Sequence, residues 1–277
     1  MLTEKTFDTG AVVIHYAEGP AHGVPLVMLH GATARWQTFL SVLPLLAMRY
    51  HTYALDLRGH GLSGRTPGAY KTVDFPKGID TFLREQVAEP AVLLGWSLGS
   101  DVALQLAAEA PELVRALILE DSDAHLITET GADETDPGLI PIFEFLRSTY
   151  DIVSKDPSFP HVLASLAAID PQEDDISRRR RAKTLGQVDP EFLLEGANNT
   201  MDLGFRPGEL AEKITCPVLL IRGDPALGGI VKDEDVDWYR SHIRDFSHIA
   251  VAGAGHNVHR TQPLTYYQHV MNFIEAI

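Results

Sequence analysis

The chain has 277 residues, of which 45% are hydrophobic and 22% are charged, and its formal net charge at pH 7 is −15. This length predicts one α/β domain with an insertion rather than two equal domains. The acidic excess argues against nucleic acid and anionic membrane surfaces as partners, because both are bound through basic patches. A small-molecule substrate is the expected partner, and no pattern in the sequence indicates an oligomeric state.

Cysteine content and the N-terminal segment bear on the compartment. Cys216 is the only cysteine, so no intrachain disulfide can form. It precedes the apolar run at 217–221, where a buried small hydrophobic residue is the expectation. The first residues have no apolar signal-peptide region, and no segment approaches the length of a membrane span. We therefore expect a soluble, cytoplasmic protein.

Apolar runs alternate with segments of helical periodicity over the first 121 residues. The runs that predict strands lie at 12–14, 25–30, 50–56, 91–94 and 116–120. Helices are predicted between them at 36–48, 80–87 and 102–110. Continuous apolar strands separated by helices predict an α/β fold with a doubly wound, mostly parallel sheet that is covered on both faces.

Residues 124–210 interrupt this alternation, because they contain no comparable apolar strand. Helical segments are predicted here at 139–150, 161–168 and 176–185. The basic run Arg178–Arg181 follows three acidic residues and is interpreted as a solvated helix face. Strands at 218–221 and 248–251, a helix at 233–243 and a final helix near 264–274 then restore the alternation. We therefore expect a core formed by 1–123 and 211–277, and an inserted helical cap at 124–210.

The segment Gly95-Trp96-Ser97-Leu98-Gly99 is a Gly-x-Ser-x-Gly motif between a predicted strand and a predicted helix. In that setting the motif forms a nucleophile elbow. Gly95 and Gly99 allow a turn too tight for flanking side chains, and Ser97 is held in a strained conformation with its hydroxyl exposed. Strain of this kind suits attack on a carbonyl rather than stability, so Ser97 is the predicted nucleophile.

Nucleophilic serine chemistry also needs a base and donors for the oxyanion. His256, in a glycine-rich loop before the last helix, is the predicted base. His259 follows three residues later, but no further metal-ligand motif accompanies the pair, so no metal is expected. The predicted oxyanion donors are the N–H groups of Ala32 and of Leu98, which begins the helix after the elbow.

Two residues are expected to line the substrate pocket. Gly31 leaves room for a substrate oxygen to approach the Ala32 amide. Trp96 stands beside the predicted nucleophile.

Together these features resemble the α/β-hydrolase superfamily, specifically its capped members with a serine nucleophile. His30-Gly31 matches the oxyanion loop of that family, and residues 56–63 match a loop commonly found there. The elbow, the interrupting cap and Gly253-Ala254-Gly255-His256 follow in the family's order. The resemblance covers most of the chain and implies a hydrolase that needs no cofactor.

One competing motif is Gly59–Gly64, which fits G-x-G-x-x-G and follows a predicted strand. A dinucleotide fingerprint must open a helix directly, so that the pyrophosphate lies on the helix N-terminus. Here the loop continues through Pro67 and Gly68 instead. The motif therefore does not indicate a nucleotide site.

The acid that orients His256 has two candidates, and both end predicted strands between Ser97 and His256. Asp121 occupies a place where some family members carry the acid and others keep an unused carboxylate. Asp224 lies on the loop where the family acid is commoner, but the usual position there is Ala226 in this chain. We favour Asp121 and keep Asp224 as the alternative.

The predicted activity is that of a serine hydrolase, in the esterase or lactonase class, which cleaves an ester, lactone or similar acyl bond through an acyl-enzyme. The alternatives are C–C bond hydrolysis or cofactor-free perhydrolysis by the same triad, and a small-molecule receptor that has lost turnover. The serine nucleophile excludes the epoxide-hydrolase and dehalogenase branches, which resemble this fold but use aspartate. No motif in 124–210 identifies the substrate.

Overall fold

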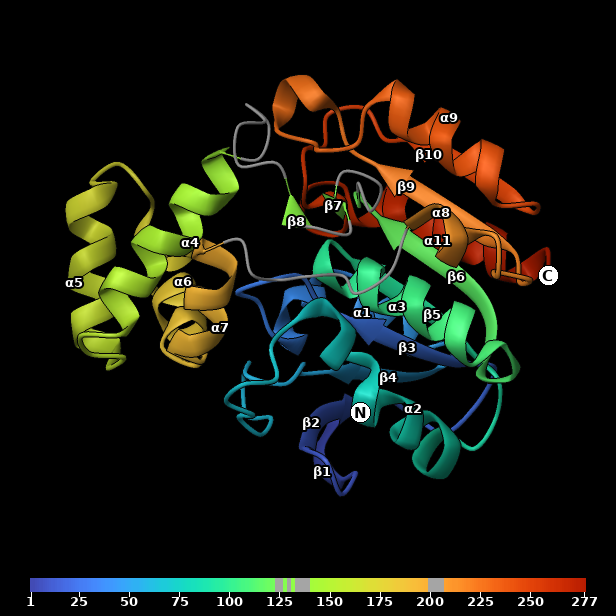
Figure 1. The fold of residues 1–277 in the computed structure, drawn as a ribbon, viewed down its shortest axis with the longest axis horizontal. Helices are drawn as coiled ribbons and strands as arrows, with labels where there is room; N and C mark the ends of the chain where they lie inside the picture. The colour runs from blue at the N-terminus through green and yellow to red at the C-terminus, as the bar shows by residue number, and fades with distance from the viewer. Residues whose placement is uncertain (123–126, 129–130, 133–139, 199–206) are drawn as a thin grey trace.

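The computed structural model describes the chain except for residues 123–126, 129–130, 133–139 and 199–206 (Figure 1). Its main sheet has eight strands in the order β1-β2-β4-β3-β5-β6-β9-β10. The two N-terminal strands, β1 (Thr3–Asp8) and β2 (Val13–Glu18), run antiparallel to their neighbours. The parallel strands are β3 (Pro25–Leu29), β4 (His51–Leu55), β5 (Ala91–Trp96), β6 (Val114–Glu120), β9 (Val218–Arg222) and β10 (Phe246–Ala250). The prediction of a mostly parallel sheet is confirmed.

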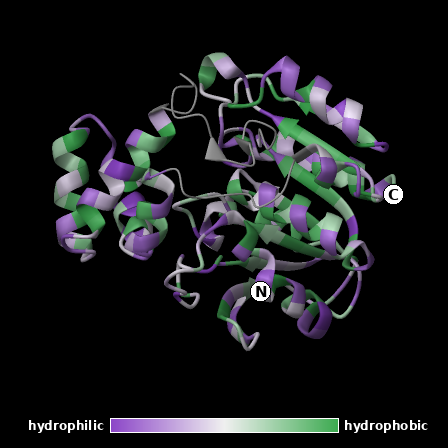
Figure 2. Cartoon of the chain, viewed as in Figure 1, coloured by the Kyte–Doolittle hydropathy of each residue, from purple (hydrophilic) through white to green (hydrophobic). Residues whose placement is uncertain are grey.

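Helices cover both faces of the sheet because the strands are apolar on both sides, as Figure 2 shows. Along β3, Leu26 and Met28 pack into one core and Val27 into the other, with the two-residue period of a strand. The first core is closed by α1 (Leu43–Leu46), α10 (Val258–Thr261) and α11 (Pro263–Glu275). The second is closed by α2 (Pro76–Phe82), α3 (Leu98–Glu109) and α9 (Asp233–His242).

Several short helices complete the core and correct the predicted ones. They are η1 (Trp36–Ser41), η2 (Thr72–Asp74), η3 (Leu83–Val87), η4 (Pro111–Leu113) and η5 (Pro225–Leu227). The single helix predicted at 36–48 is wrong, since η1 ends and α1 begins again around Pro44. Proline has no N–H to continue the helical hydrogen bonds, so it starts a new helix rather than extending the old one.

The segment between β6 and β9 contains the helical insertion. It includes the short pair β7 (Ile127–Thr128) and β8 (Gly131–Ala132), followed by α4 (Ile140–Val153), α5 (Phe159–Ile169), α6 (Asp175–Leu185), α7 (Pro190–Ala197) and α8 (Pro207–Ala211). Helices α4 to α7 lie together beside the sheet (Figure 1), whereas α8 packs against α3 and α9. The predicted cap boundary at 210 lies within α8. Its predicted start at 124, and residue 139, lie outside the described residues.

The end of the insertion is anchored to the core loop at 56–75. The Tyr70 hydroxyl donates to Asp189 Oδ2 at 2.6 Å, and the Asp189 N–H donates to the Gly59 carbonyl at 2.7 Å. Phe192 is fully buried, and its ring lies 4.4 Å from that of His60. These contacts hold α7 against the same loop that supports the candidate site.

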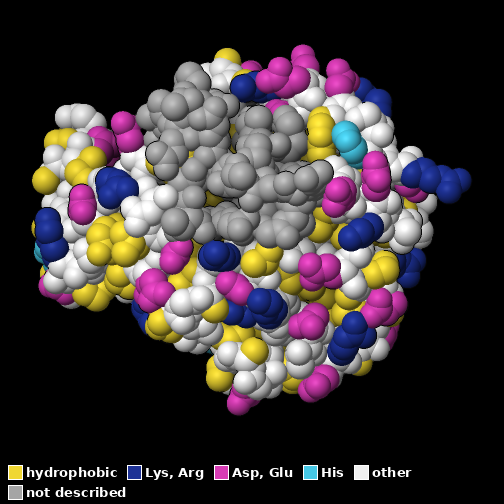
Figure 3. All heavy atoms as spheres, viewed as in Figure 1, with side chains coloured by type: hydrophobic (Ala, Val, Ile, Leu, Met, Phe, Trp, Pro, Cys, Tyr) yellow, Lys and Arg dark blue, Asp and Glu magenta, His cyan; other side chains and the backbone are white. Residues whose placement is uncertain are grey.

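The surface carries charges of both signs. Acidic and basic side chains are interspersed over the part of the face in Figure 3 that is not grey. Among the described helices, none is both long enough and apolar enough to cross a bilayer.

Candidate active site

Ser97 lies at a sharp turn between β5 and α3. Its backbone has φ 51° and ψ −123°, a conformation that costs a non-glycine residue on the order of 1–3 kcal/mol. The flanking glycines are required by close backbone contacts. A Cβ on Gly99 would lie 2.0 Å from the Leu29 carbonyl oxygen, and one on Gly95 would lie 2.3 Å from that of Gly99. The local backbone is therefore the strained strand-to-helix turn that the motif predicts.

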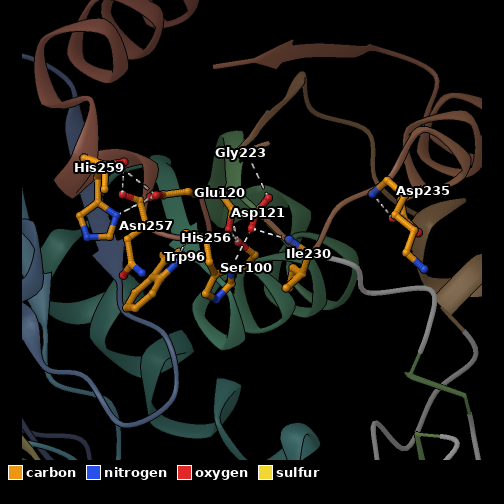
Figure 4. Close-up of polar contacts among 12 residues, drawn as sticks. Trp96, Ser100, Glu120, Asp121, Gly223, Ile230, Asp235, His256, Asn257 and His259 are labelled. Carbon is orange, nitrogen blue, oxygen red and sulfur yellow. Dashed lines mark hydrogen bonds and ion pairs between the residues drawn. The ribbon is translucent and has the colours of Figure 1, made fainter. Parts of the chain in front are cut away.

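Asp121 and His256 are paired. His256 Nδ1 lies 2.8 Å from Asp121 Oδ2, and the Asp121 side chain is fully buried (Figure 4). The N–H groups of Gly223 and Ile230 donate to the two carboxylate oxygens at 3.1 and 2.9 Å. Since the carboxylate only accepts, the neutral imidazole carries its proton on Nδ1 and leaves Nε2 as an acceptor.

The alternative acid, Asp224, is not brought to His256. Its Oδ1 accepts the N–H of Ala226 at 2.9 Å and caps η5, while its own N–H donates to the Ala254 carbonyl at 2.6 Å. Asp224 therefore has the geometry of a helix-capping residue. Between the two predicted candidates, only Asp121 faces the histidine.

Trp96 connects the nucleophile turn to the histidine loop. Its indole N–H donates to the His256 carbonyl at 2.8 Å, and the two rings lie 5.4 Å apart. The Ser97 hydroxyl has no hydrogen-bond partner among the described residues, so the structure does not form a Ser97–His256 hydrogen bond. Catalytic hydrogen bonds of this kind often tighten only when substrate binds.

The two predicted oxyanion donors are backbone N–H groups on either side of the Ser97 turn. The N–H groups of Ala32 and Leu98 donate to no acceptor within the described residues. A Cβ on Gly31 would lie 3.1 Å from the Ser97 Cβ, so the loop that carries Ala32 lies directly against the nucleophile turn. Such unpaired N–H groups beside a serine suit the binding of a developing oxyanion.

Two buried histidines that the sequence analysis did not assign hold this loop in place. His30 Nδ1 lies 2.8 Å from the Gly31 carbonyl, and His30 Nε2 accepts the Leu57 N–H at 3.0 Å. His60 Nε2 accepts the N–H of Thr33, whose φ is 57°, at 3.3 Å. Burial lowers the pKa of His30 and lowers the pKa of His60 to about 3, so both rings stay neutral and keep these bonds.

The glycines of the G-x-G-x-x-G match have a structural role. Asp56 is buried and accepts the N–H groups of Trp36 and Leu62 at 2.8 and 3.0 Å, together with His15 Nδ1 at 2.8 Å. A Cβ on Gly61 would lie 2.1 Å from the Asp56 carboxylate. The glycine makes room for this carboxylate and not for a phosphate.

His259 is engaged on both ring nitrogens. Nδ1 lies 2.8 Å from the Glu120 carboxylate, and Nε2 lies 3.1 Å from Thr38 Oγ1. Across the described part of the chain, no group of three or more His, Cys, Asp or Glu side chains is placed to hold a metal ion. The His256–His259 spacing therefore reflects two separate carboxylate contacts.

A cavity of about 640 Å³ reaches the site between the core and the insertion. Ala32 and Trp96 line it from the core, and Phe145, Phe159 and Leu185 from the insertion.

The solvated-face interpretation of the arginine run is wrong for Arg178, which is buried and donates to backbone carbonyls. It holds for Arg179 and Arg180, which are exposed, although both also line the cavity with the half-buried Arg181.

Comparison with known proteins identifies the fold family. The family model described as alpha/beta hydrolase fold matches residues 24–259. The chain belongs to the α/β-hydrolase fold family. The match begins just before β3 and ends at His259, and so it covers the serine, the aspartate and the histidine described above.

Named relatives of this α/β hydrolase are hydrolases. It is 24% identical to 2-(acetamidomethylene)succinate hydrolase of Mesorhizobium japonicum over 98% of this chain and 95% of that protein. It is 27% identical to a pimeloyl-[acyl-carrier protein] methyl ester esterase of Pectobacterium carotovorum, over 92% and 96% of the two chains. The crystal structure of E-2-(acetamidomethylene)succinate hydrolase has the same fold, with a TM-score of 0.76, 24% identity and coverage of 99% and 100%. The prediction of a hydrolase is confirmed.

Proposed function

We propose that this hydrolase cleaves an ester, lactone or similar acyl bond of a small organic substrate through an acyl-enzyme on Ser97. The observation that carries the proposal is the 2.8 Å contact between buried Asp121 and His256, in a loop that Trp96 joins to the nucleophile turn. A histidine oriented by a carboxylate beside a strained serine is the arrangement that activates a hydroxyl.

In the first half-reaction Ser97 Oγ attacks the substrate carbonyl, and His256 Nε2 takes the hydroxyl proton. The bond of Asp121 to Nδ1 keeps Nε2 unprotonated before this step and stabilises the imidazolium after it. The N–H groups of Ala32 and Leu98 bind the tetrahedral oxyanion. In related sites one such donor contributes about 3–4 kcal/mol.

In the second half-reaction His256 has already given its proton to the leaving group. Its Nε2 then accepts a proton from water, which attacks the acyl carbonyl, and His256 returns this proton to Ser97 Oγ as the acid leaves. The same donors stabilise the second oxyanion, and Ser97 is restored. No cofactor takes part in this sequence.

The insertion supplies the outer walls of the pocket in this proposal. We propose that the cap, residues 124–210, covers a core formed by 1–123 and 211–277, and that cap residues such as Phe145 and Phe159 face the substrate. Aromatic and aliphatic walls around a few fixed polar groups are usual for small-molecule sites.

A fluorophosphonate probe with intact-mass and peptide analysis tests the nucleophile. We expect one adduct per chain, on Ser97, and none in Ser97→Ala. Ser177→Ala is the matched control, since Ser177 lines the cavity beside the site but lies on α6. A panel of p-nitrophenyl esters and lactones then measures turnover. A chain that is unlabelled and inactive on the panel would contradict the proposal.

A further inference from the structure

Several cationic side chains line the cavity beside the candidate site, together with apolar ones. Its basic lining residues are Arg35, Arg179, Arg180, Arg181, Lys183 and Arg260. Glu173 is the one acidic residue among the described lining residues, and it is already paired with Arg181 at 3.3 Å. Although the chain has a net charge of −15, these cations create a local positive potential in the cavity. Such a potential favours the binding of an anionic ligand.

Two of these arginines lack a carboxylate partner. Arg180 and Arg260 form no ion pair with any acidic side chain in the described ranges. They also line, with Thr38 and Asn257, a second hollow of about 340 Å³ that adjoins the first. Both arginines are exposed, and they line both hollows without an acidic partner among the described residues.

Arg35 adds a third guanidinium to this group. It donates to Gln187 at 3.0 Å, while its Nε is buried without a hydrogen-bond partner. Burial lowers the pKa values of Arg35 and Arg260, and the positive charge of Arg180 lowers both further. The charge of Arg180 thus acts on both of the other arginines. Mutual repulsion of this kind is relieved when an anion binds among them.

Two of these arginines are close in sequence to the proposed catalytic groups. Arg35 lies three residues after the oxyanion donor Ala32, and Arg260 lies four residues after His256. Arg180 comes from α6 of the insertion, on the opposite wall. Neither Ser97 nor His256 lines the cavity itself. An anion held by the arginines would therefore bind beside the reacting carbonyl and not on it.

We infer that Arg35, Arg180 and Arg260 form a carboxylate-binding subsite, and that the substrate is an acyl compound with a second, free carboxylate group. This inference rests on the proposed acyl-hydrolase function and specifies its substrate class. A carboxylate matches the planar fork of a guanidinium and can be held by two parallel hydrogen bonds. A cavity of about 640 Å³ accommodates a small dicarboxylic monoester.

The test compares two esters that differ in one charge. Mono-p-nitrophenyl adipate carries a free carboxylate, whereas methyl p-nitrophenyl adipate is its neutral counterpart. We expect kcat/KM to be at least about ten-fold higher for the anionic ester, which corresponds to about 1.4 kcal/mol. The overall negative charge of the protein works against this preference, so it can only come from a local site.

Arginine variants locate the subsite. Arg180→Gln and Arg260→Gln are expected to reduce the ratio of the two kcat/KM values by about ten-fold each. Arg84→Gln is the matched control, because Arg84 is exposed and pairs with Glu112 away from the cavity. A ratio near one in the wild-type protein, or a ratio that survives both cavity variants, would overturn the inference.

A binding measurement separates this inference from the proposed function. Adipate is titrated into Ser97→Ala, with dimethyl adipate and inorganic phosphate as controls, and the melting temperature and calorimetric heat are followed. Adipate alone should stabilise the protein, and Arg180→Gln should remove the effect. Adipate binding by a chain that hydrolyses neither ester would contradict the proposed function alone. No adipate binding, or tighter binding of phosphate, would contradict the carboxylate subsite.

Discussion

Glu120 and His259 form a fully buried pair that lies next to the pair of Asp121 and His256 (Figure 4). The Glu120 carboxylate accepts both the ring Nδ1–H and the backbone N–H of His259, at 2.8 and 2.9 Å. The Glu120 carbonyl also accepts the Ser97 N–H at 3.0 Å. One residue at the end of β6 thus fixes the backbone of the nucleophile turn and the helix that follows the histidine loop.

Removal of the Glu120 charge should therefore destabilise the fold. Glu120→Gln replaces an acceptor of His259 by an amide that can also donate, in a fully buried site. We expect a loss of about 3 kcal/mol in the free energy of unfolding, measured with urea. Glu275→Gln is the control, because the Arg49–Glu275 pair is more than half exposed and should contribute less than about 1 kcal/mol. Equal losses in both variants would show that the buried pair has no special role.

Exchange of the acid for its amide should separate Asp121 from Asp224. Asp121 accepts three donors, and an asparagine cannot accept all of them, so Asp121→Asn should disturb the Nδ1 contact of His256. A loss of up to about 10⁴ in kcat is expected for an acid in this role. Asparagine caps helices as well as aspartate, so Asp224→Asn should cost a few-fold at most. Steady-state kinetics on one p-nitrophenyl ester measures both, and the reverse ordering would assign the role to Asp224.

Space around Gly31 should matter more for activity than for stability. A Cβ there would lie 3.0–3.2 Å from Trp96 and 3.1 Å from the Ser97 Cβ, which is tight contact with two neighbours. Gly31→Ala should displace Trp96 and the nucleophile turn by a few tenths of an ångström. We expect kcat/KM to fall by at least about ten-fold, since misplacement of reacting groups is costly. The change in unfolding free energy should stay near 1–2 kcal/mol. Unchanged kcat/KM would show that the oxyanion loop tolerates a side chain at this position.

The buried pair of His15 and Asp56 should make stability depend on pH. The hydrogen bond to Asp56 raises the pKa of His15. Burial opposes ionisation of Asp56, but the hydrogen bond from His15 and the backbone N–H donors hold its pKa below the ordinary value. The contribution of His15 is complete below its unfolded pKa of about 6.5 and is lost as the pH rises through its folded value. The contribution of Asp56 is complete above about 3.9 and is lost as the pH falls through its folded value.

Both contributions are therefore present between about pH 4 and pH 6.5. The difference in unfolding free energy between the wild type and His15→Gln should be largest in that window, at about 1.5–3 kcal/mol. It should shrink toward pH 9. Urea unfolding at a series of pH values measures it, and a difference that is constant with pH would show that His15 is not charged in the pair.

The elbow was predictable because the local motif dictates it, whereas the acid was not. Gly95 and Gly99 are needed for contacts within a few residues of Ser97, so sequence spacing alone predicts the turn. Asp121 and Asp224 follow adjacent parallel strands, β6 and β9, and both meet the requirement of chain order. Which carboxylate faces His256 depends on side-chain direction across the sheet edge. That information is absent from the order of residues.

The cationic cluster could not be predicted for a similar reason. Arg35, Arg180 and Arg260 are separated by at least 80 residues and are joined only by the packing of α6 over the core. The run at 178–181 has the composition of a solvated face, and helical geometry then turns Arg178 inward. The edge strand β1 was missed because its residues are mostly exposed and lack an apolar pattern. In each case tertiary contacts decide what local composition leaves open.

Within the described residues, four non-glycine residues have positive φ, and three of them are Thr33, Ser97 and Asp121. Positive φ is thus concentrated at the predicted nucleophile, at the predicted acid and in the loop that carries the predicted oxyanion donor Ala32. A Ser97→Gly variant would relieve the backbone strain at residue 97. It would be inactive and more stable toward unfolding. Substitutions that relieve this strain therefore tend to give proteins that are more stable but inactive. The strained serine is therefore retained only where selection for turnover outweighs the stability that its replacement would add.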